Sequence, residues 1–212
     1  MGYAVKEIFY SIQGEGFHAG RPTVFCRFSG CNLWSGLEKH RSIAQCRFCD
    51  TDFVGTDGTF GAKYRTADDL ARQLKSLWPC DSGVPYVVFT GGEPTLQLDE
   101  ELVQACHTRG FEVGVETNGT RKVPNGIDWI CVSPKPRASL VQIFGHELKL
   151  VYPQLEEEMS PSHFTNLDFM HFFVQPMATE KENEHLQQTL EYCLQNPQWK
   201  LSLQTHKIVG VR

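Results

Sequence analysis

Three cysteines in one segment of the sequence could hold an inorganic centre. Fourteen residues separate Cys31 from Cys46, and two residues separate Cys46 from Cys49. A structural zinc ion takes four Cys or His ligands, so it would need a further ligand such as His40 or His18. An iron–sulfur cluster normally takes four cysteines, so a [4Fe–4S] cluster with three thiolates leaves one iron open for chemistry. The spacing alone leaves zinc, a cluster and plain free thiols as alternatives.

The chain has eight cysteines in 212 residues, and the remaining five have different surroundings. No basic segment followed by a long apolar run opens the sequence, so we expect no signal peptide and a cytoplasmic protein. Thiols in that setting indicate metal or redox chemistry more than disulfides. Buried structural thiols are expected where the flanking residues are apolar or helical, at Cys26, Cys80, Cys106, Cys131 and Cys193.

Composition places the chain among globular proteins of one domain, spanning residues 1–212. Hydrophobic residues make up 41% of the sequence, and the net charge is −5. A general nucleic-acid binder would need a basic surface, so direct nucleic-acid binding is not expected. No apolar run reaches the roughly 20 residues that span a bilayer, so we expect no membrane association.

Strand-length apolar runs alternate with helix-like segments along the chain. The expected strands are 23–28, 86–91, 111–117, 129–134, 147–152, 171–176 and 199–205, and the expected helices are 66–78, 98–110 and 180–196. In the last helix, Leu186, Leu190 and Leu194 recur every four residues, which predicts an apolar face. Alternating strands and helices predict an α/β protein with a parallel sheet.

Polar and Gly-rich residues follow five of the expected strands. In parallel α/β folds, ligands bind at the carboxyl ends of the strands. We therefore expect one shared pocket lined by these segments, which are Gly91–Glu93, Glu116–Gly119, Ser133–Lys135, Gln175–Pro176 and His206.

The three cysteines, with Phe48 directly before Cys49, resemble those of radical S-adenosylmethionine (SAM) enzymes, most of which have a first gap of three residues. The fourteen-residue gap, together with "SIQGEG" and "CDT", resembles the 7-carboxy-7-deazaguanine synthases. Similar segments follow in order over nearly the whole chain, including "VVFTGGEPTLQ", "VETNGT", "WICVSPK", "FFVQPM" and "LSLQTHK". The resemblance implies an incomplete (β/α) TIM-type barrel of parallel strands with a modified cluster-binding loop, assembled as a homodimer.

The resemblance also implies the cofactors and their ligands. Cys31, Cys46 and Cys49 would hold a [4Fe–4S] cluster whose open iron SAM chelates. The residues implied for SAM are Phe48, Asp50, Gly92, Ser133, Lys135, Gln175 and Pro176. Glu93 is expected to brace its loop. Asn118 either binds the cofactor or occupies a turn, and Thr51 either binds Mg²⁺ or caps a helix.

The implied substrate is 6-carboxy-5,6,7,8-tetrahydropterin. Its implied contacts are Ile12, Gln13, Gly14, Glu15, Arg27, Thr90, His206 and Arg212. Arg27 is the one charged residue of an apolar strand and needs a partner, which the substrate carboxylate would provide. Instead of binding substrate, residues 12–15 could form only a Gly-rich hairpin, and His206 could be only a partly exposed C-terminal residue. The sequence leaves open whether Arg212 contacts the substrate.

The implied enzyme is a carbon–nitrogen lyase of queuosine biosynthesis, a tRNA modification pathway. A flavodoxin-type donor would reduce the cluster, and a 5′-deoxyadenosyl radical would start ring contraction to 7-carboxy-7-deazaguanine with loss of ammonia. Two rivals remain: a radical SAM activase of a protein partner and a zinc-stabilised binding module.

Overall fold

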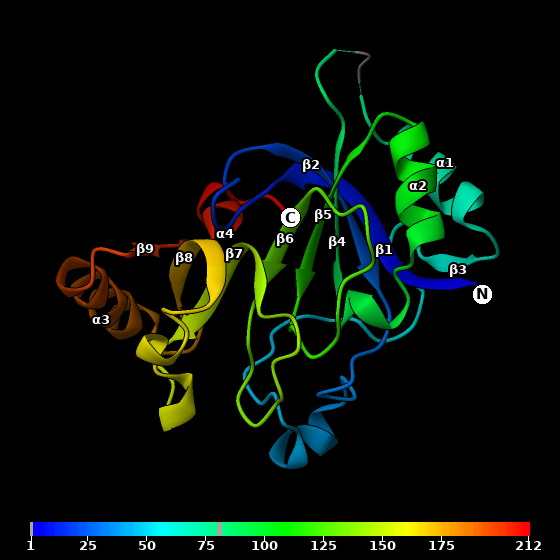
Figure 1. The fold of residues 1–212 in the computed structure, drawn as a ribbon. Coiled ribbons are helices and arrows are strands. Elements are labelled where there is room, and N and C mark those ends of the chain that lie inside the picture. Colours follow the sequence, from blue (N-terminus) through cyan, green and yellow to red (C-terminus); the bar gives the residue numbers. More distant parts are fainter. Residues whose placement is uncertain (1, 80–81) are drawn as a thin grey trace.

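One curved β-sheet forms the framework of the protein. The computed structural model describes residues 2–79 and 82–212. Within them, nine strands form a single sheet in the order β3-β1-β2-β4-β5-β6-β7-β8-β9 (Figure 1). The strands are β1 (Tyr3–Ile12), β2 (Pro22–Phe28), β3 (Ala62–Tyr64), β4 (Tyr86–Gly91), β5 (Glu112–Thr117), β6 (Trp129–Val132), β7 (Phe144–Tyr152), β8 (Asp168–Pro176) and β9 (Trp199–Leu201). Cys80 lies outside the described residues.

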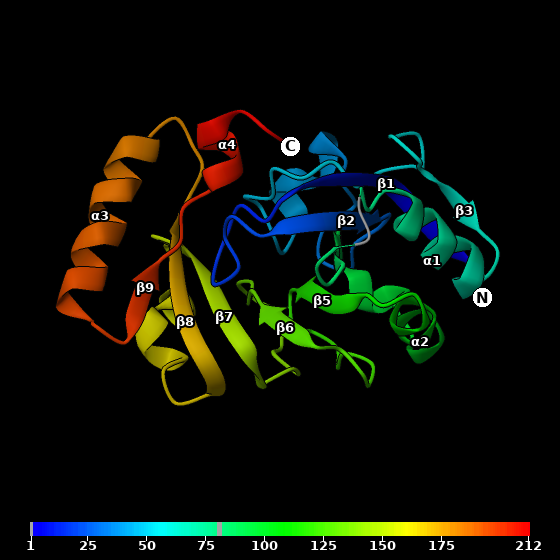
Figure 2. The ribbon, with the colours of Figure 1, turned by 90° about the horizontal axis from the view of Figure 1, so that it is seen from above.

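The helices are α1 (Ala67–Ser76), α2 (Glu100–Thr108), α3 (Glu182–Gln195) and α4 (Thr205–Val209). Helices α1, α2 and α3 lie on the outer side of this sheet, and α4 lies beside its opening (Figure 2). Short 3₁₀ turns occur at Glu38–Ile43, Pro94–Leu96, Glu157–Met159 and Pro161–His163. Between β5, β6 and β7 the described chain runs as loops, so those strands lack the crossover helices of a complete (β/α) barrel.

The expected parallel sheet is confirmed for β2 and for β4 to β9. It is wrong for the amino-terminal end of the chain, where β1 runs antiparallel to both β2 and β3. Neither β1 nor β3 was predicted as a strand. A short connection joins β1 to β2, and antiparallel pairing is what such a connection permits, since a parallel pair needs a long crossover.

The sheet curves without closing. Figure 2 shows β9 and β1 on opposite sides of an opening, with α4 beside it. The strand order has two free ends, at β3 and β9, so the incomplete barrel implied by the resemblance is confirmed. None of the described helices is long and apolar enough to cross a bilayer.

Local sequence explains where the two central helices begin. The Thr66 hydroxyl accepts a hydrogen bond from the Asp69 N–H at 3.1 Å, and the Asp99 carboxylate accepts one from the Leu102 N–H at 3.0 Å. These caps satisfy N–H groups that a helix leaves free in its first turn. The buried faces of both helices then pack into the main hydrophobic core with strands β4 and β5.

Helix α3 buries a different face from the predicted one. Thr189 is fully buried, and Tyr192 and Cys193 pack against the core. These positions are three and four residues apart and therefore share one face. The predicted apolar face is wrong, since Leu190 is exposed and Leu194 is 74% exposed.

The last predicted strand is shorter than expected, and a short helix follows it. β9 ends at Leu201 instead of residue 205. The Ser202 N–H still donates to Val174 O at 2.9 Å, and the Thr205 N–H then donates to Gly14 O at 2.8 Å. The chain thus leaves the sheet to meet the β1–β2 connection, and α4, which was not predicted, carries His206 to that place.

Two leucine substitutions test this assignment of buried faces. Leu102→Ala should lower the free energy of unfolding by about 2–5 kcal/mol, because it leaves a cavity at a fully buried position. The matched control Leu194→Ala should change it by less than about 0.5 kcal/mol, since this side chain is mostly exposed. Urea titration followed by circular dichroism measures both. A large loss at Leu194 would contradict the position of α3.

Candidate active site

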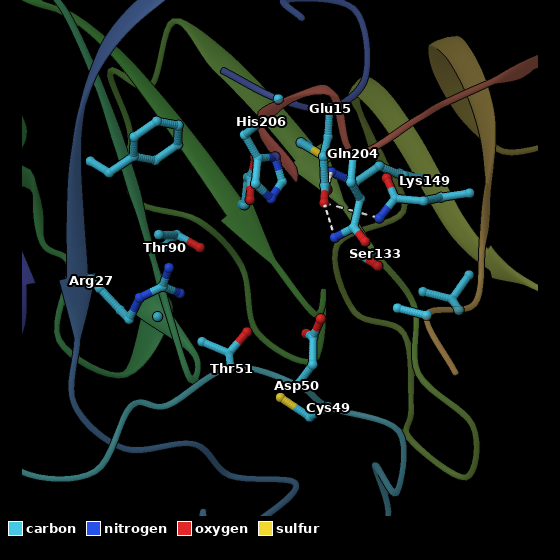
Figure 3. A pocket seen from close by; sticks show the side chains of 18 of the residues that line it. Glu15, Arg27, Cys49, Asp50, Thr51, Thr90, Ser133, Lys149, Gln204 and His206 are labelled. Atoms are coloured by element: carbon cyan, nitrogen blue, oxygen red, sulfur yellow. Dashed lines mark hydrogen bonds and ion pairs between the residues drawn. The ribbon is translucent and has the colours of Figure 1, made fainter. Parts of the chain in front are cut away.

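A cavity of about 540 Å³ lies at the carboxyl ends of the strands. The predicted position of the shared pocket is confirmed, because each of the five predicted strand-end segments contributes to its lining. Every predicted site residue except Cys31 lines this cavity. In Figure 3, Glu15, Arg27, Thr51, Thr90 and His206 surround it. The binding roles of these residues stay predictions.

The cysteine segment forms one wall of the cavity. Cys46 and Cys49 line it, and Cys31 packs behind them, with Trp34, Ala44 and Phe53. A hydrogen bond from the Cys46 thiol lowers the pKa of Cys49 to about 6, opposed by burial and helped by the Thr51 N–H. One thiol of this pair is therefore prepared to act as a thiolate, the form that binds metal.

Arg41 holds the cysteine segment in shape. Its guanidinium lies 4.1 Å from the ring centre of Trp34, and it donates to Arg47 O at 2.8 Å and to Cys49 O at 3.0 Å. Those carbonyls belong to the residues around the second and third cysteines. A cation in this position fixes the loop by hydrogen bonds and by cation–π attraction.

The two histidines considered as a fourth zinc ligand contact other side chains. The His18 ring lies 4.2 Å from that of Trp129, and His40 Nδ1 lies 2.8 Å from Ser35 Oγ. Among residues 2–79 and 82–212, no three His, Cys, Asp or Glu side chains converge on one ion. The thiolates of a cluster bind different irons, so they need not converge on one point. The donor set therefore fits a three-thiolate cluster better than zinc.

The Gly-rich loop after β4 is packed against the cysteine segment. A Cβ added to Gly92 would lie 2.1 Å from Gly30 O and 2.8 Å from Cys31 Cβ. The chain's own backbone therefore already requires glycine here, in addition to any approach of the cofactor. This contact ties the predicted SAM loop to the first predicted cluster ligand.

Glu93 braces that loop, as predicted. It is fully buried, and its carboxylate accepts hydrogen bonds from Thr95 N–H, Thr95 Oγ1, Thr117 Oγ1 and Asn118 N–H at 2.6–3.0 Å. It thereby joins the ends of β4 and β5. The Asn118 side chain accepts from Thr120 and donates to Asn32, so the turn alternative holds for Asn118 in this structure.

Lys135 stands at the wall formed by the end of β6. Its ammonium donates to Ser133 O and Ser133 Oγ, both at 2.7 Å. Within the described part of the chain it has no carboxylate partner at ion-pair distance. A lysine placed in this way can receive an anionic group of a ligand.

The β1–β2 connection is both a hairpin and a part of the pocket. Glu15 is bound by Lys149 Nζ at 2.5 Å, Gln204 Nε2 at 2.8 Å and Gln175 Nε2 at 3.0 Å. Burial raises the pKa of Glu15, but the charge of Lys149 and these hydrogen bonds outweigh it and bring the pKa to about 2. Three side chains of the protein already bind the Glu15 carboxylate, which lines the cavity, and its expected contact with the substrate stays a prediction.

Gln13 and Gln175 also have protein partners. Gln13 Nε2 donates to Glu116 Oε1 at 2.9 Å, and its Oε1 accepts from the Glu15 N–H at 3.2 Å. Gln175 Oε1 accepts from Ser202 Oγ at 2.9 Å. These hydrogen bonds hold both side chains in the cavity wall.

His206 lies directly against Gly14. A Cβ on Gly14 would lie 1.8 Å from His206 Nδ1, so only glycine allows the ring to occupy this place. The ring lines the cavity, as does Thr90 (Figure 3). His206 is half-buried, which agrees with the partly exposed position given as the alternative, and its contact with the substrate stays a prediction.

Arg27 has a protein partner that the sequence did not reveal. Its Nε donates to Glu7 Oε1 at 3.0 Å, and Arg212 also pairs with Glu7 through Oε2. Arg27 thus has within the protein the partner that it was expected to need, and its binding of the substrate carboxylate stays a prediction. Two guanidinium groups share the one carboxylate of Glu7. Figure 3 shows the Arg27 guanidinium pointing into the cavity beside Thr90.

Thr51 lies between two ion pairs. Asp50 pairs with Lys207 at 3.2 Å, and Asp52 pairs with Lys6 at 2.8 Å. No helix begins in residues 52–61, so the helix-cap alternative for Thr51 is wrong. The Thr51 hydroxyl has no hydrogen-bond partner within the described chain and is available to an oxygen-preferring cation such as Mg²⁺.

Several lining residues were missed by sequence reasoning. Lys149 is the one lysine of an apolar strand, the same signal that singled out Arg27. Glu116 was noted at a strand end but given no role. The others have no clear sequence signal, and they are Lys6, Glu7, Phe9, Phe25, Gln204 and Lys207.

The buried-thiol predictions are confirmed for three of the four described cysteines concerned and hold in part for Cys193. Cys26, Cys106 and Cys131 are buried, and Cys193 is half-buried against the core. Burial raises the pKa of Cys131, whose Sγ donates to Glu147 Oε1 at 3.3 Å. Cys131 also lines the cavity, which the sequence did not indicate.

Comparison with known proteins agrees with this geometry. The sequence model of the radical SAM superfamily matches residues 42–131. The chain is 57% identical to the 7-carboxy-7-deazaguanine synthase of Bradyrhizobium diazoefficiens over the full length of both chains. It is 57% identical to that of Bordetella pertussis, again covering 100% of each chain.

More distant matches also extend over nearly the whole chain. The synthase of Synechocystis is 31% identical, covering 100% of this chain and 95% of the relative. The crystal structure of QueE from Escherichia coli superposes with a TM-score of 0.71 at 23% identity, covering 97% of this chain and 95% of that one. The chain belongs to the 7-carboxy-7-deazaguanine synthase family of radical SAM enzymes.

Proposed function

We propose that the chain, as a single domain, converts 6-carboxy-5,6,7,8-tetrahydropterin to 7-carboxy-7-deazaguanine with loss of ammonia. The observation that carries this proposal is the meeting of the cysteine segment and the charged strand ends around one cavity. The family membership supports the same reaction. The direct test is the mass of the product after anaerobic incubation with this pterin, SAM and dithionite, and an unchanged pterin would contradict it.

The cluster and SAM, when bound, supply the 5′-deoxyadenosyl radical that takes hydrogen from the substrate. The thiols of Cys31, Cys46 and Cys49 would hold the cluster, and Gly92 keeps its loop against Cys31. Lys135 would bind the carboxylate or ribose of SAM, since its ammonium has no acidic partner. The remaining contacts would come from Phe48, Asp50, Ser133 and Pro176 and from the backbone of Gln175.

Arg27 would bind the substrate carboxylate through its two Nη nitrogens. Glu7 occupies only Nε, and Arg212 offsets the charge of Glu7. The arrangement therefore attracts an anion and leaves a planar fork free for bidentate binding. Thr90, His206 and the backbone of residues 12–14 would complete the substrate site, and Thr51 would share Mg²⁺ with the substrate.

A flavodoxin-type protein is the electron donor that we infer. The 3₁₀ turn Glu38–Ile43 precedes the second cysteine and carries an 81% exposed Ile43. Lys39 and Arg47 are exposed in the same segment without an acidic partner among the described residues. Such a surface suits an acidic partner that must approach the cluster. Homodimer assembly and a cytoplasmic location remain part of the proposal.

The cluster assignment predicts the effect of single cysteine substitutions. Cys31→Ala, Cys46→Ala or Cys49→Ala should lower the iron bound after anaerobic reconstitution and abolish reductive cleavage of SAM. Cys193→Ala is the matched control and should retain both, because this thiol packs against the core away from the cavity. Iron is measured by colorimetric assay and methionine by chromatography. Normal SAM cleavage by Cys31→Ala would show that the cluster is held differently.

Substitution of Arg27 should weaken substrate binding and leave the cluster intact. Arg27→Ala should reduce affinity for the carboxypterin by about 2–5 kcal/mol, because the substrate carboxylate loses its partner. Arg27→Lys should recover only part of the loss, since an ammonium lacks the planar fork. Calorimetric titration measures both, with exposed Arg72→Ala as the control. Unchanged affinity in Arg27→Ala would remove this residue from the substrate site.

Magnesium dependence should act through the Thr51 hydroxyl. Thr51→Val should reduce the stimulation of turnover by Mg²⁺, whereas Thr51→Ser, which keeps the oxygen, should restore most of it. Iron content should stay normal in both variants. Mg²⁺ and substrate should each strengthen the binding of the other by the same factor. Product formation is followed after chelator treatment, with and without Mg²⁺. Equal stimulation of wild type and Thr51→Val would place the metal elsewhere.

A further inference from the structure

The acidic side chains of the cavity differ in how they are neutralised. Four of its carboxylates have a cation at ion-pair distance: Glu7 with Arg27 at 3.0 Å, Glu15 with Lys149 at 2.5 Å, Asp50 with Lys207 at 3.2 Å and Asp52 with Lys6 at 2.8 Å. Glu116 also lines the cavity and has no such partner among the described residues. An acidic group left without a cation in a cavity indicates that a ligand provides its donors.

Glu116 keeps one carboxylate oxygen free. Gln13 Nε2 donates to its Oε1 at 2.9 Å, and this is the hydrogen bond that the described chain gives to the side chain. Oε2 has no donor within residues 2–79 and 82–212. A carboxylate oxygen can accept more than one hydrogen bond, so Oε1 also retains accepting capacity. The group can therefore accept two adjacent N–H donors of a ligand.

The sheet register places Glu116 opposite Arg27 across Thr90. Arg27 pairs with Thr90 between β2 and β4, and Phe89 pairs with Val115 between β4 and β5. One residue further along, the same register sets Thr90 beside Glu116. Arg27, Thr90 and Glu116 therefore lie in one row across three neighbouring strands. Two strand spacings separate the ends of this row, which is roughly 10 Å. One side of the cavity thus carries a positive charge at one end and a negative charge at the other.

We propose that Glu116 determines specificity by accepting hydrogen bonds from the aminopyrimidinone ring of the substrate. This inference rests on the proposed function. The 2-amino group and the neighbouring ring N–H of the pterin are adjacent donors, and the acid group is on its other ring. A substrate with its carboxylate at Arg27 would direct these donors toward Glu116. Glu15 has less capacity for this purpose, because Lys149, Gln175 and Gln204 already bind it.

Binding measured without turnover tests this role. The reconstituted enzyme is titrated anaerobically with 6-carboxytetrahydropterin in the presence of SAM and Mg²⁺ and in the absence of a reductant. Glu116→Gln should bind the pterin about 10- to 100-fold more weakly, the range expected for hydrogen bonds to a charged group. Glu101→Gln, at an exposed carboxylate, is the matched control and should bind like wild type.

A ligand lacking the 2-amino group separates direct contact from an effect through Gln13. Wild type should bind this deamino analogue about 10- to 100-fold more weakly than the parent pterin, and Glu116→Gln should distinguish the two ligands by less than about 3-fold. Equal discrimination by both proteins would overturn the inference, since Glu116 would then act only by positioning Gln13. Wild-type affinity of Glu116→Gln for the parent pterin would also overturn it.

The same titrations distinguish this inference from the proposed function. If wild type binds the parent pterin and Arg27→Ala weakens that binding, the proposed substrate stands whatever the result at Glu116. If wild type does not bind the pterin, both the proposed substrate and the role of Glu116 are contradicted. Thermal unfolding of Glu116→Gln should match that of wild type, because the amide keeps the shape of the side chain and an oxygen to accept from Gln13.

Discussion

The buried ion pair between Glu15 and Lys149 joins the two sides of an open barrel. Glu15 belongs to the β1–β2 connection, Lys149 belongs to β7, and their charged atoms lie 2.5 Å apart. Gln175 and Gln204 donate to the same carboxylate from β8 and from the segment before α4. Removing one partner of such a pair leaves an uncompensated buried charge, which costs about 3–5 kcal/mol. The cavity therefore keeps its shape across a gap that strand pairing does not close, and the hydrogen bond from Thr205 N–H to Gly14 O at 2.8 Å adds a backbone contact there.

The other charged side chains of the cavity differ in whether the protein itself pairs them. A polar cavity surrounded by a hydrophobic core is tolerated because most of its ionic groups neutralise one another. The exceptions are informative: Lys135 lacks an acidic partner, Glu116 lacks a basic one, and Glu7 is shared by two arginines. These three places mark where an anionic cofactor group, a donor edge and a substrate carboxylate would complete the balance.

The cysteine segment depends on the same sheet through close backbone contacts. Gly92 touches Gly30 and Cys31, and Glu93 fixes the following turn against the end of β5. A long gap between the first two cysteines can be accommodated because Arg41 and Trp34 hold the intervening residues together. The predicted cluster ligands and the predicted cofactor loop are thus positioned by one packed unit, although fourteen residues separate Cys31 from Cys46.

The sequence by itself determined the features that depend on neighbours along the chain. Strand β4 was predicted with its observed bounds, and the caps at Thr66 and Asp99 fix helices near their predicted starts. The strand ends were expected to meet because parallel strands present their carboxyl ends to one edge. The three cysteines with their flanking motifs were sufficient to indicate the family.

Only the tertiary structure decided which groups are already satisfied. Glu15 was expected to read the substrate, yet its partner Lys149 is 134 positions away in the sequence. Arg27 is met by Glu7 because β1 pairs antiparallel with β2, a pairing that the expected parallel sheet did not include. Periodicity likewise could not tell that α3 buries Thr189 instead of Leu194, since rotation of a helix is set by the strands it packs against. Local patterns specify elements, whereas charge pairing and burial depend on contacts between elements distant in sequence, and those exist only in the folded chain.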